Sequence, residues 1–432
     1  MDKLLLKEAR EKIILLGNEA IVRGALEAGV NFVSTYPGTP SSEIGNTFYR
    51  IAKEAGVYFE FSTNEKVALE AGIGASFSGL KTLVAMKNFG LNVCLDALAP
   101  FVYTGTKGPT VIIVADDPSC HSSAQSEENT RPMDNIVHIP ILEPSDPQEC
   151  LDFVKLGFKI SEKFNIPVMV RTTTRVAHQK MPVKISNLKP SVFKKGTFVK
   201  DVKRFVTLPP RVLEMKKELF EKIEKIKSVA ETLLQMEGKK QKIGIITSGV
   251  SYLYVKEALA EMKLDLPVLK LIFSYPLAEK GIKAFIKGLK KVLVVEELES
   301  HLEKEVERLA KQNNCKLEVF GKNLLPVVGE LKPEYVVEAI SKITGKAYAL
   351  KKAELKPLKR SPQLCPGCPY WLVVSAIKKA VDVNKVIFGG EIGCYMLFGN
   401  SPINLQDYLS CMGSSVGIAH GIKKATSQKL IT

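Results

Sequence analysis

The sequence lacks several features that would assign it to large and familiar protein classes. No apolar run reaches the roughly 18–20 residues that a membrane-spanning helix requires. No G-x4-G-K-[ST] or G-x-G-x-x-G motif occurs, which argues against ATP or NAD chemistry. The first residues, M-D-K-L-L-L-K-E-A-R, carry scattered charges and do not read as a signal peptide. We therefore expect a cytoplasmic protein that does not enter the membrane.

Cysteine is scarce, and its distribution is uneven. The chain has 432 residues and 8 cysteines, half of them between positions 365 and 411. So few cysteines in so long a chain indicate a reducing compartment, with the clustered ones reserved for chemistry. We interpret Cys94, Cys120, Cys150 and Cys315 as small buried hydrophobic residues.

Positive charge is in excess, but aromatic residues do not accompany it. The formal net charge is +15, and the densest basic stretch lies at 189–211. No aromatic stripe of the kind that stacks bases is interleaved with it, so we predict no nucleic-acid binding. A lysine-rich solvated surface is the simpler interpretation, and attraction of an acidic protein partner is the alternative.

Apolar strand-like runs alternate with helical patterns along most of the chain. The runs are at 31–36, 57–61, 82–86, 110–115 and 167–171, and again from 242 onward. This alternation predicts an α/β protein of several domains with doubly wound parallel sheets. We expect a first domain at 1–185, a linker with one amphipathic helix at 186–238, a second α/β domain at 239–345 and a last domain at 358–432. A basic connector joins the last two.

The stretch from Leu364 to Gly421 carries the most distinctive residues. Cys365 and Cys368 form a C-x2-C pair in a Pro/Gly turn, and Cys394 follows an apolar strand and two glycines. A C-x2-C turn alone is equally typical of a structural zinc site. A zinc ribbon would need a second C-x2-C, which this chain lacks. Three cysteines among glycine-rich loops instead suit a cuboidal iron–sulfur site with one ligand still to be found.

Three motifs in this stretch carry a specific resemblance. C-P-G-C, G-E-I-G-C-Y and C-M-G-S-S-V-G-I-A-H-G resemble the thiamine-diphosphate domain of 2-oxoacid:ferredoxin oxidoreductases. Within that family they look most like the large (alpha) subunits that act on indolepyruvate, and the similarity extends over essentially the whole chain. The resemblance implies that Cys365, Cys368 and Cys394 hold a 4Fe–4S cluster beside the cofactor. Cys411 is either a fourth ligand or a packed residue, and we favour packing. The cofactor-binding positions it implies here are Gly393, Cys394, Gly413 and Ser414.

A glycine turn between a strand and a helix marks a first candidate site. After the strand at 31–36 comes P-G-T-P-S-S-E, in which we expect Thr39 to cap a helix that has Pro40 at its first position. Such a helix start can bind an anion, or it is simply a well-made turn. The matching loop of the family lies by the substrate. By that likeness, Thr39 contacts the 2-oxoacid. One helix earlier, we expect Asn18 to be an N-cap.

A glutamate opens the next helix. Glu65 begins a helix that is rich in alanine and glycine and therefore packs closely on a neighbour. A glutamate in a first turn usually does no more than stabilise the helix dipole. By resemblance, however, Glu65 matches the carboxylate that hydrogen-bonds the aminopyrimidine of thiamine diphosphate and so activates it. Thr39 and Glu65 are therefore the candidate catalytic residues.

A long polar loop and a pair of strand-end glutamates complete the candidates. The loop D-D-P-S-C-H-S-S-A-Q-S-E-E-N-T-R offers His121, Gln125 and Arg131 as substrate-binding side chains. Arg131 could clamp a carboxylate with both arms, whereas His121 could equally be an exposed loop histidine. We interpret Glu296 and Glu297 as surface or interface residues.

The resemblance implies oxidative decarboxylation of arylpyruvates to acyl-CoA. It implies thiamine diphosphate and Mg²⁺, a smaller beta subunit, coenzyme A, and ferredoxin as electron acceptor. Three alternatives stay open. They are a related oxidoreductase of other substrate range, a non-oxidative thiamine decarboxylase, and a non-catalytic iron–sulfur or zinc subunit.

One part of the family pattern is missing from this sequence. The family follows its G-I-A-H-G helix with a strand and a G-D-S or G-D-G loop that carries metal and diphosphate ligands. This sequence stops at Q-K-L-I-T. Mg²⁺ needs carboxylate oxygens as well as the diphosphate. We therefore expect the chain to behave as a fragment, inactive alone and poorly ordered after about Leu364, with an uncovered apolar sheet.

Overall fold

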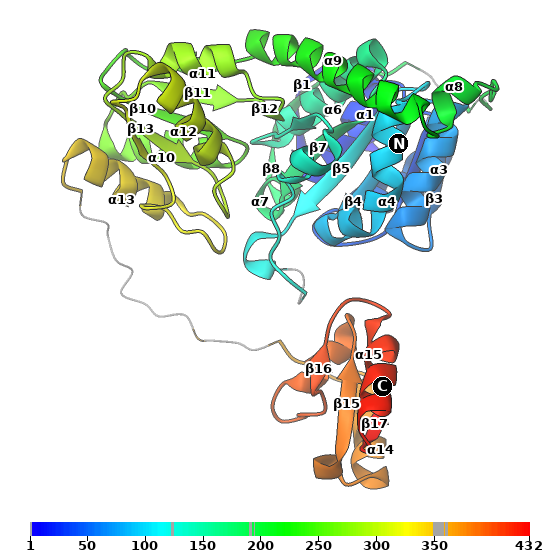
Figure 1. Ribbon diagram of the computed structural model, residues 1–432. Coiled ribbons are helices and arrows are strands. Elements are labelled where there is room, and N and C mark those ends of the chain that lie inside the picture. The colour runs from blue at the N-terminus through cyan, green and yellow to red at the C-terminus, as the bar shows by residue number, and fades with distance from the viewer. Residues whose placement is uncertain (1, 122–124, 190–191, 194, 349–357, 359–361) are drawn as a thin grey trace. The chain divides into compact units, whose positions relative to one another are not determined.

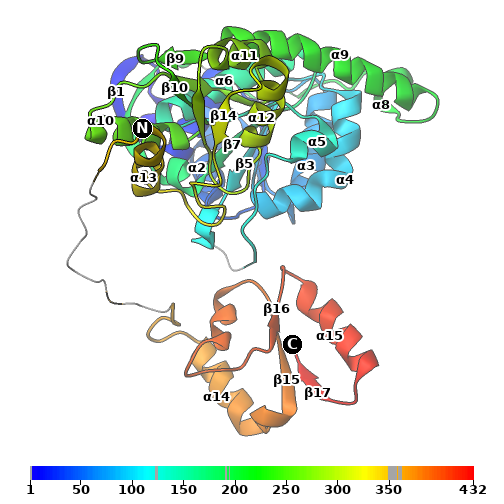
Figure 2. The same ribbon diagram turned by 60° about the vertical axis from the view of Figure 1, so that its left-hand side comes forward.

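The computed structural model describes residues 2–121, 125–189, 192–193, 195–348, 358 and 362–432. The chain forms two compact units, one of residues 1–121 with 127–349 and one of 122–126 with 350–432. Figures 1 and 2 show the first unit as two α/β modules, each built around its own sheet. Of the basic connector predicted after position 357, residues 359–361 lie outside the described residues.

A seven-stranded sheet forms the first module. Its strands are β2 (Phe32–Thr35), β3 (Tyr58–Phe61), β4 (Thr82–Lys87), β5 (Thr110–Asp116), β6 (Ile141–Leu142), β7 (Val168–Thr173) and β12 (Phe273–Tyr275). Their order is β12-β6-β7-β5-β4-β2-β3, and all pairs are parallel except β12 with β6. The predicted doubly wound α/β fold is confirmed. Because the strands are parallel, their carboxyl ends and the loops that follow them share one edge, where such folds bind ligands.

Helices cover both faces of this sheet. They are α1 (Gly17–Glu27), α2 (Ser42–Ala55), α3 (Glu65–Phe77), α4 (Asn88–Thr104), α5 (Met133–Val137), α6 (Pro147–Phe164) and α7 (Thr174–His178). Gly72 of α3 lies so close to Val84 that a Cβ would be 2.6 Å from its methyl group, whereas Gly157 of α6 faces Val111. Val84 and Val111 point to opposite faces, since Val111 is aligned with Leu83, the neighbour of Val84. The close packing predicted for the small-residue helix α3 is therefore present.

Two helix starts differ from the sequence prediction. Asn18 is not an N-cap, because α1 begins at Gly17 with Leu16 as its cap and Glu19 hydrogen-bonded back to the Leu16 amide. Thr39 is not an N-cap either, because α2 begins at Ser42 with Ser41 as its N-cap, so Pro40 precedes the helix.

An antiparallel pair of strands, which we did not predict, lies outside the main sheet. β1 (Arg10–Leu16) pairs with β8 (Lys180–Ile185). The buried guanidinium of Arg23 donates to the carbonyls of Leu4, Leu6 and Ser186, which ties these ends of the module together. Such a pair is hard to predict because its partners are far apart in sequence.

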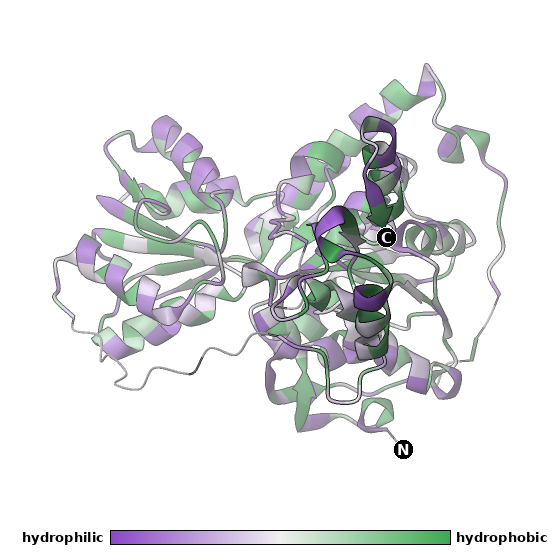
Figure 3. Ribbon diagram, turned by 90° about the horizontal axis from the view of Figure 1, so that it is seen from below, coloured by the Kyte–Doolittle hydropathy of each residue, from purple (hydrophilic) through white to green (hydrophobic). Residues whose placement is uncertain are grey.

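A five-stranded sheet forms the second module. Its strands are β9 (Gln235–Glu237), β10 (Ile243–Ser248), β11 (Val268–Leu271), β13 (Lys291–Val295) and β14 (Glu318–Phe320), in the order β14-β13-β10-β11-β9. The helices of the second module and its approach are α8 (Val202–Phe205), α9 (Arg211–Thr232), α10 (Ser251–Met262), α11 (Glu279–Ile286), α12 (Leu302–Asn313) and α13 (Pro333–Thr344). Figure 3 shows apolar strands between helices that carry polar residues. This is the pattern of a sheet buried on both faces.

The second unit is a small three-stranded sheet with its own core. It contains α14 (Tyr370–Ala380), β15 (Val386–Gly390), β16 (Tyr408–Leu409), α15 (Ser414–Ala425) and β17 (Lys429–Ile431), with both neighbours of β15 parallel to it. Its core contains Leu364, Val374, Val386, Phe388, Ile403 and Leu405. The structure thus gives this stretch defined elements, where we expected poor order. Most of its exposed large apolar side chains lie on the helices, among them Leu372 and Val416.

No helix in the parts of the chain that the structure describes is long and apolar enough to span a bilayer.

Candidate functional site

The start of α4 is the point at which the two candidate catalytic residues meet. Lys87 is the last residue of β4 and precedes α4, and its ammonium group donates to the carbonyl oxygen of Thr39 at 2.6 Å. The same ammonium donates to Asp117 Oδ2 at 3.0 Å. The side chains of Lys87 and Asp117 are 7% and 0% exposed, so this is a buried ion pair. It holds the Thr39 loop against the carboxyl ends of β4 and β5.

Glu65 reaches the same helix start from α3. A Cβ on Gly90 would lie 2.3 Å from Glu65 Cγ and 2.9 Å from Oε1, so the carboxyl group packs directly on the backbone of α4. Glu65 begins α3, as the sequence predicted, and Asn64 is the N-cap. Burial raises the pKa of Glu65. A half-buried carboxyl group with a raised pKa is suited to exchanging a proton with a bound group.

The Thr39 loop is also fixed from its other side. The buried amide of Asn18 donates to the carbonyl of Pro40 at 2.7 Å and to Glu43 Oε2 at 2.8 Å. The side chain of Asn18 therefore stabilises the Thr39 loop and does not cap α1. Thr39 Oγ1 lies 3.3 Å from Ser42 Oγ, at the start of α2. The loop is thus held by Asn18 on one side and by Lys87 on the other.

Unused hydrogen-bonding groups collect where α4 begins. The side chain of Asn88 is fully buried, yet in the described part of the chain neither its amide nitrogen nor its amide oxygen has a partner. The N-cap of α4 makes no side-chain hydrogen bond to the first turn. Free amide groups at a helix N-terminus attract anions. A polar or anionic ligand at this helix start would satisfy these groups.

The predicted substrate-binding residues of the polar loop after β5 lie in different surroundings. His121 is exposed, and its Nε2 lies 3.5 Å from Glu330 Oε2. It lines a cavity of about 710 Å³ between the two modules, together with Thr174, Arg175, His178 and Tyr254. Gln125 is grouped with the second unit. Within the first unit, His121 is exposed at this cavity, whereas Arg131 is buried.

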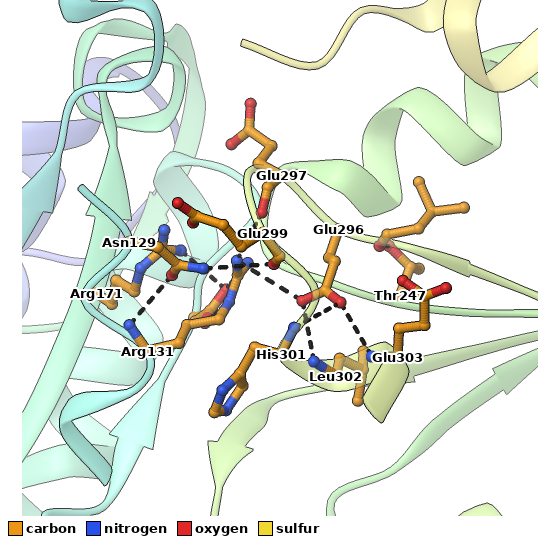
Figure 4. A network of polar contacts seen from close by, with 12 residues as sticks. Asn129, Arg131, Arg171, Thr247, Glu296, Glu297, Glu299, His301, Leu302 and Glu303 are labelled. Atoms are coloured by element: carbon orange, nitrogen blue, oxygen red, sulfur yellow. Dashed lines mark hydrogen bonds and ion pairs between the residues drawn. The ribbon is translucent and has the colours of Figure 1, made fainter. Parts of the chain in front are cut away.

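Arg131 clamps a carboxylate, but that carboxylate belongs to the chain itself. Its Nε and Nη2 donate to the two oxygens of Glu143 at 2.7 and 2.8 Å, and Nη1 donates to the carbonyl of Glu297 at 3.1 Å. Figure 4 shows Arg131 reaching from the first module toward Glu296 and Glu297 of the second. The predicted role of Arg131 in substrate binding is therefore corrected. Its fork is occupied, and the side chain is 2% exposed.

Glu296 and Glu297 are buried, which excludes the surface position and leaves the interface as the remaining predicted alternative. Glu296 accepts the backbone amides of His301, Leu302 and Glu303 and so caps α12. Glu297 accepts the amide of Leu331, and burial raises its pKa to about 7. Arg131 of the first module contacts both residues at this strand end.

The cysteines of the second unit lie on three separate segments. Cys365 and Cys368 share one turn, Cys394 begins a 3₁₀ helix (Cys394–Gly399), and Cys411 precedes α15. Among the described residues, no group of three or more His, Cys, Asp or Glu side chains could hold one metal ion. That criterion applies to a single ion, whereas each cysteine of a 4Fe–4S cluster binds a different iron, so the three-cysteine cluster stays a prediction. Cys411 is exposed rather than packed, and Cys315 and Cys120 are not buried either.

A carboxylate links two of the diagnostic motifs in this unit. Glu391 accepts the amide and hydroxyl of Ser415 at 3.0 and 2.7 Å, and these hydrogen bonds lower its pKa. The loops that carry Gly393 and Cys394 on one side and Gly413 and Ser414 on the other are therefore joined at the start of α15.

Comparison with known proteins identifies the family. Residues 23–232 match the family described as pyruvate flavodoxin/ferredoxin oxidoreductase, thiamine diphosphate-binding, and residues 234–356 match the indolepyruvate oxidoreductase domain. The chain is 43% identical over 444 residues to the indolepyruvate oxidoreductase subunit IorA of Methanothermobacter marburgensis, covering 100% of this chain and 72% of that protein. The IorA subunit of Pyrococcus horikoshii is 42% identical, with 99% and 68% covered. This chain belongs to the IorA family.

A solved structure supports the fold of this IorA-family chain. It is a 2-oxoglutarate:ferredoxin oxidoreductase from Magnetococcus marinus with 2-oxoglutarate, coenzyme A and succinyl-CoA bound. Its TM-score is 0.62 at 19% identity, with 77% of this chain and 65% of that chain covered. At this identity the likeness concerns the fold alone.

The residues of the first module suit a thiamine cofactor in this IorA-family chain. Glu65 has the partial burial and raised pKa that a carboxyl partner of the aminopyrimidine needs. The unpaired Asn88 amide at the same helix start leaves polar groups for a ligand. Sequence analysis missed Lys87, Asn88 and Asp117. A lysine that ends the buried run T-L-V-A-M-K, and an aspartate pair that ends the next one, were the available signal.

Proposed function

We propose that this chain is the substrate-activating subunit of an enzyme that oxidatively decarboxylates arylpyruvates. The reaction takes a 2-oxoacid, coenzyme A and two oxidised ferredoxins to acyl-CoA, CO2, two reduced ferredoxins and a proton. The observation that carries this proposal is the meeting of Glu65 and the Thr39 loop at the start of α4. Membership of a family whose relatives are named indolepyruvate oxidoreductase supports the substrate class.

The catalytic roles follow from this arrangement. Bound thiamine diphosphate supplies a carbanion nucleophile and an electron sink for decarboxylation of the 2-oxoacid. Glu65 would hold the aminopyrimidine ring and keep a proton at its nitrogen, a role that its raised pKa favours. Thr39 would contact the 2-oxoacid, since Asn18 and Lys87 fix its loop in place.

Several parts of the complete enzyme are also proposals. We propose a smaller partner subunit, Mg²⁺ with the cofactor, and a 4Fe–4S cluster on Cys365, Cys368 and Cys394. These cysteines lie in one turn and at the start of a 3₁₀ helix, and we assign no electron-transfer step to them. A cytoplasmic location accords with the free state of all eight cysteines.

The proposed function is tested by activity of the complete enzyme on a panel of 2-oxoacids with coenzyme A and ferredoxin. Arylpyruvates should be the best substrates. Glu65→Gln should leave folding intact and lower turnover by about 10²- to 10⁴-fold, the usual effect of removing a positioned acid–base group. Release of aldehyde without reduction of ferredoxin would instead indicate the non-oxidative decarboxylase. Near-normal activity of the variant would remove Glu65 from the mechanism.

A further inference from the structure

We propose that Lys87 binds the carboxylate of the 2-oxoacid substrate. This inference rests on the proposed function and adds a substrate-binding residue to it. An anionic substrate needs a positively charged partner at the carboxyl edge of the sheet. The sequence suggested Arg131 for that role, but both arms of its guanidinium are bound to Glu143.

The surroundings of Lys87 leave one hydrogen-bonding position open. An ammonium group has three N–H donors. Two of them are used, one by the carbonyl of Thr39 and one by Asp117. In the described part of the chain no acceptor is found for the third, and the ammonium lies 5.2 Å from the centroid of the Phe89 ring. A substrate held at Thr39 is therefore next to a free donor that carries a positive charge.

The helix start adds to this attraction for an anion. Lys87 is the N-cap of α4, a helix of 17 residues, and no side chain caps its first turn. Asn88, the first residue of the helix, is fully buried with both amide atoms unpaired. An unpaired buried polar atom lowers stability, so a ligand that pairs with it is favoured. The charged lysine and the unpaired amide belong to consecutive residues at this helix start.

The geometry also places this carboxylate site correctly for the proposed chemistry. Glu65 packs on Gly90, in the same first turn of α4 that Lys87 precedes. The carboxyl group that would activate the cofactor and the ammonium that would hold the substrate thus share one helix end. Burial lowers the pKa of Lys87, while the carboxylate of Asp117 opposes this and favours the charged form.

Other cations of the first module suit the role less well. The guanidinium of Arg171 is buried between Asp116 and Glu143. Arg175 is paired by both arms with Glu330. Lys87 is the cation whose hydrogen bond reaches Thr39, the residue predicted to contact the substrate.

The test compares two buried lysines in the complete enzyme. Lys87→Met is paired with Lys270→Met, because Lys270 is also buried and ion-paired, with Glu149, but lies in β11 of the second module. The probes are indole-3-propionate and its primary amide, used as inhibitors of arylpyruvate oxidation. A hydrogen-bonded ion pair with the carboxylate predicts that the wild-type enzyme binds the acid about 10- to 100-fold more tightly than the amide.

We expect Lys87→Met to reduce this preference to near unity and to raise KM for the arylpyruvate about 10- to 100-fold. Lys270→Met should keep the preference, and Lys87→Arg should restore part of it. A preference unchanged in Lys87→Met would overturn the proposal. So would a fall in kcat with KM and the preference unchanged, since that result would mean that Lys87 only positions Thr39.

A further variant keeps the test decisive if Lys87→Met does not fold. Asp117→Asn removes the carboxylate that competes for the ammonium but that also favours its charged form, so the acid inhibitor should bind several-fold more tightly at a pH low enough to keep Lys87 protonated. Weaker binding of the acid would count against the proposal. If the wild-type enzyme does not oxidise arylpyruvates at all, the proposed function fails rather than the role of Lys87.

Discussion

The carboxyl group of Glu65 lies directly on the backbone of Gly90. A Cβ at position 90 would be 2.3 Å from Glu65 Cγ and 2.8 Å from Cδ, which is closer than real side chains approach. Glycine at this position therefore sets where the candidate acid–base group sits. The contact joins the N-terminal turns of α3 and α4, two helices that follow different strands.

Gly90→Ala should impair catalysis while sparing the fold. Because the added methyl group meets the end of a flexible side chain, Glu65 can move aside, and we expect the melting temperature to change little. Displacement of a catalytic group by about 1 Å can lower turnover about 10²-fold. Gly74→Ala is the matched control, since Gly74 is exposed on α3 and a Cβ there would meet no atom within 4 Å. It should retain activity and gain about 0.5–1 kcal/mol of stability.

The stability of the protein should fall as the pH rises from about 5 to 7.5, through Glu297. Burial raises its pKa to about 7, above the ordinary 4.5, so the folded state binds the proton more tightly than the unfolded state. The contribution of Glu297 to the free energy of unfolding is fully present below pH 4.5 and is lost as the pH rises through 7. Between these limits the free energy of unfolding falls by roughly 3 kcal/mol. Urea unfolding across this range should show a weaker pH dependence in Glu297→Gln. The exposed neighbour Glu299→Gln should keep the wild-type dependence.

Arg131→Met should destabilise the protein by about 3–5 kcal/mol, because it leaves Glu143 buried with only Arg171 as its charged partner. The Arg131 guanidinium beside Glu143 helps to lower the pKa of that carboxyl to about 2. Adding Glu143→Gln should recover part of the loss. In the folded fraction, KM for the 2-oxoacid should not change. If Arg131→Met instead raised KM and left stability unchanged, Arg131 would have to be assigned to substrate binding after all.

Replacing Cys365, Cys368 or Cys394 with serine in the complete enzyme should each remove the iron of one 4Fe–4S cluster. Cys315→Ser is the control, because Cys315 is also exposed but belongs to the second module. Iron content measured after anaerobic purification decides the question. Iron unchanged by Cys394→Ser would end the three-ligand assignment.

Much of the fold could be predicted from local pattern. The apolar runs that became β2, β4, β5 and β7 are buried on both faces, so their residues are continuously hydrophobic and easy to recognise. β6 and β12 contain two and three residues, and the pair β1–β8 joins distant segments. Strands this short or this isolated form because a partner strand lies beside them, and a single sequence does not show which segments will be neighbours.

The site was predictable where one residue carried a local signal, and not where two distant residues had to meet. Glu65 could be placed at a helix start from the pattern after its strand. The pairing of Lys87 with Asp117 depends on β4 and β5 being neighbours in the sheet. Arg131 was assigned to a substrate because Glu143, its actual partner, follows a strand of only two residues.

β12 has a consequence for attempts to dissect the chain. The first family match ends at residue 232 and the second begins at residue 234. Residues 273–275, within the second match, nevertheless form β12, the outermost strand of the seven-stranded sheet of the first module. A protein cut at that division would leave β6 as an open edge, with unpaired backbone groups available to other chains. Isolated expression of the first module should therefore give self-association. The two modules are better regarded as one cooperative unit, to be produced and denatured together.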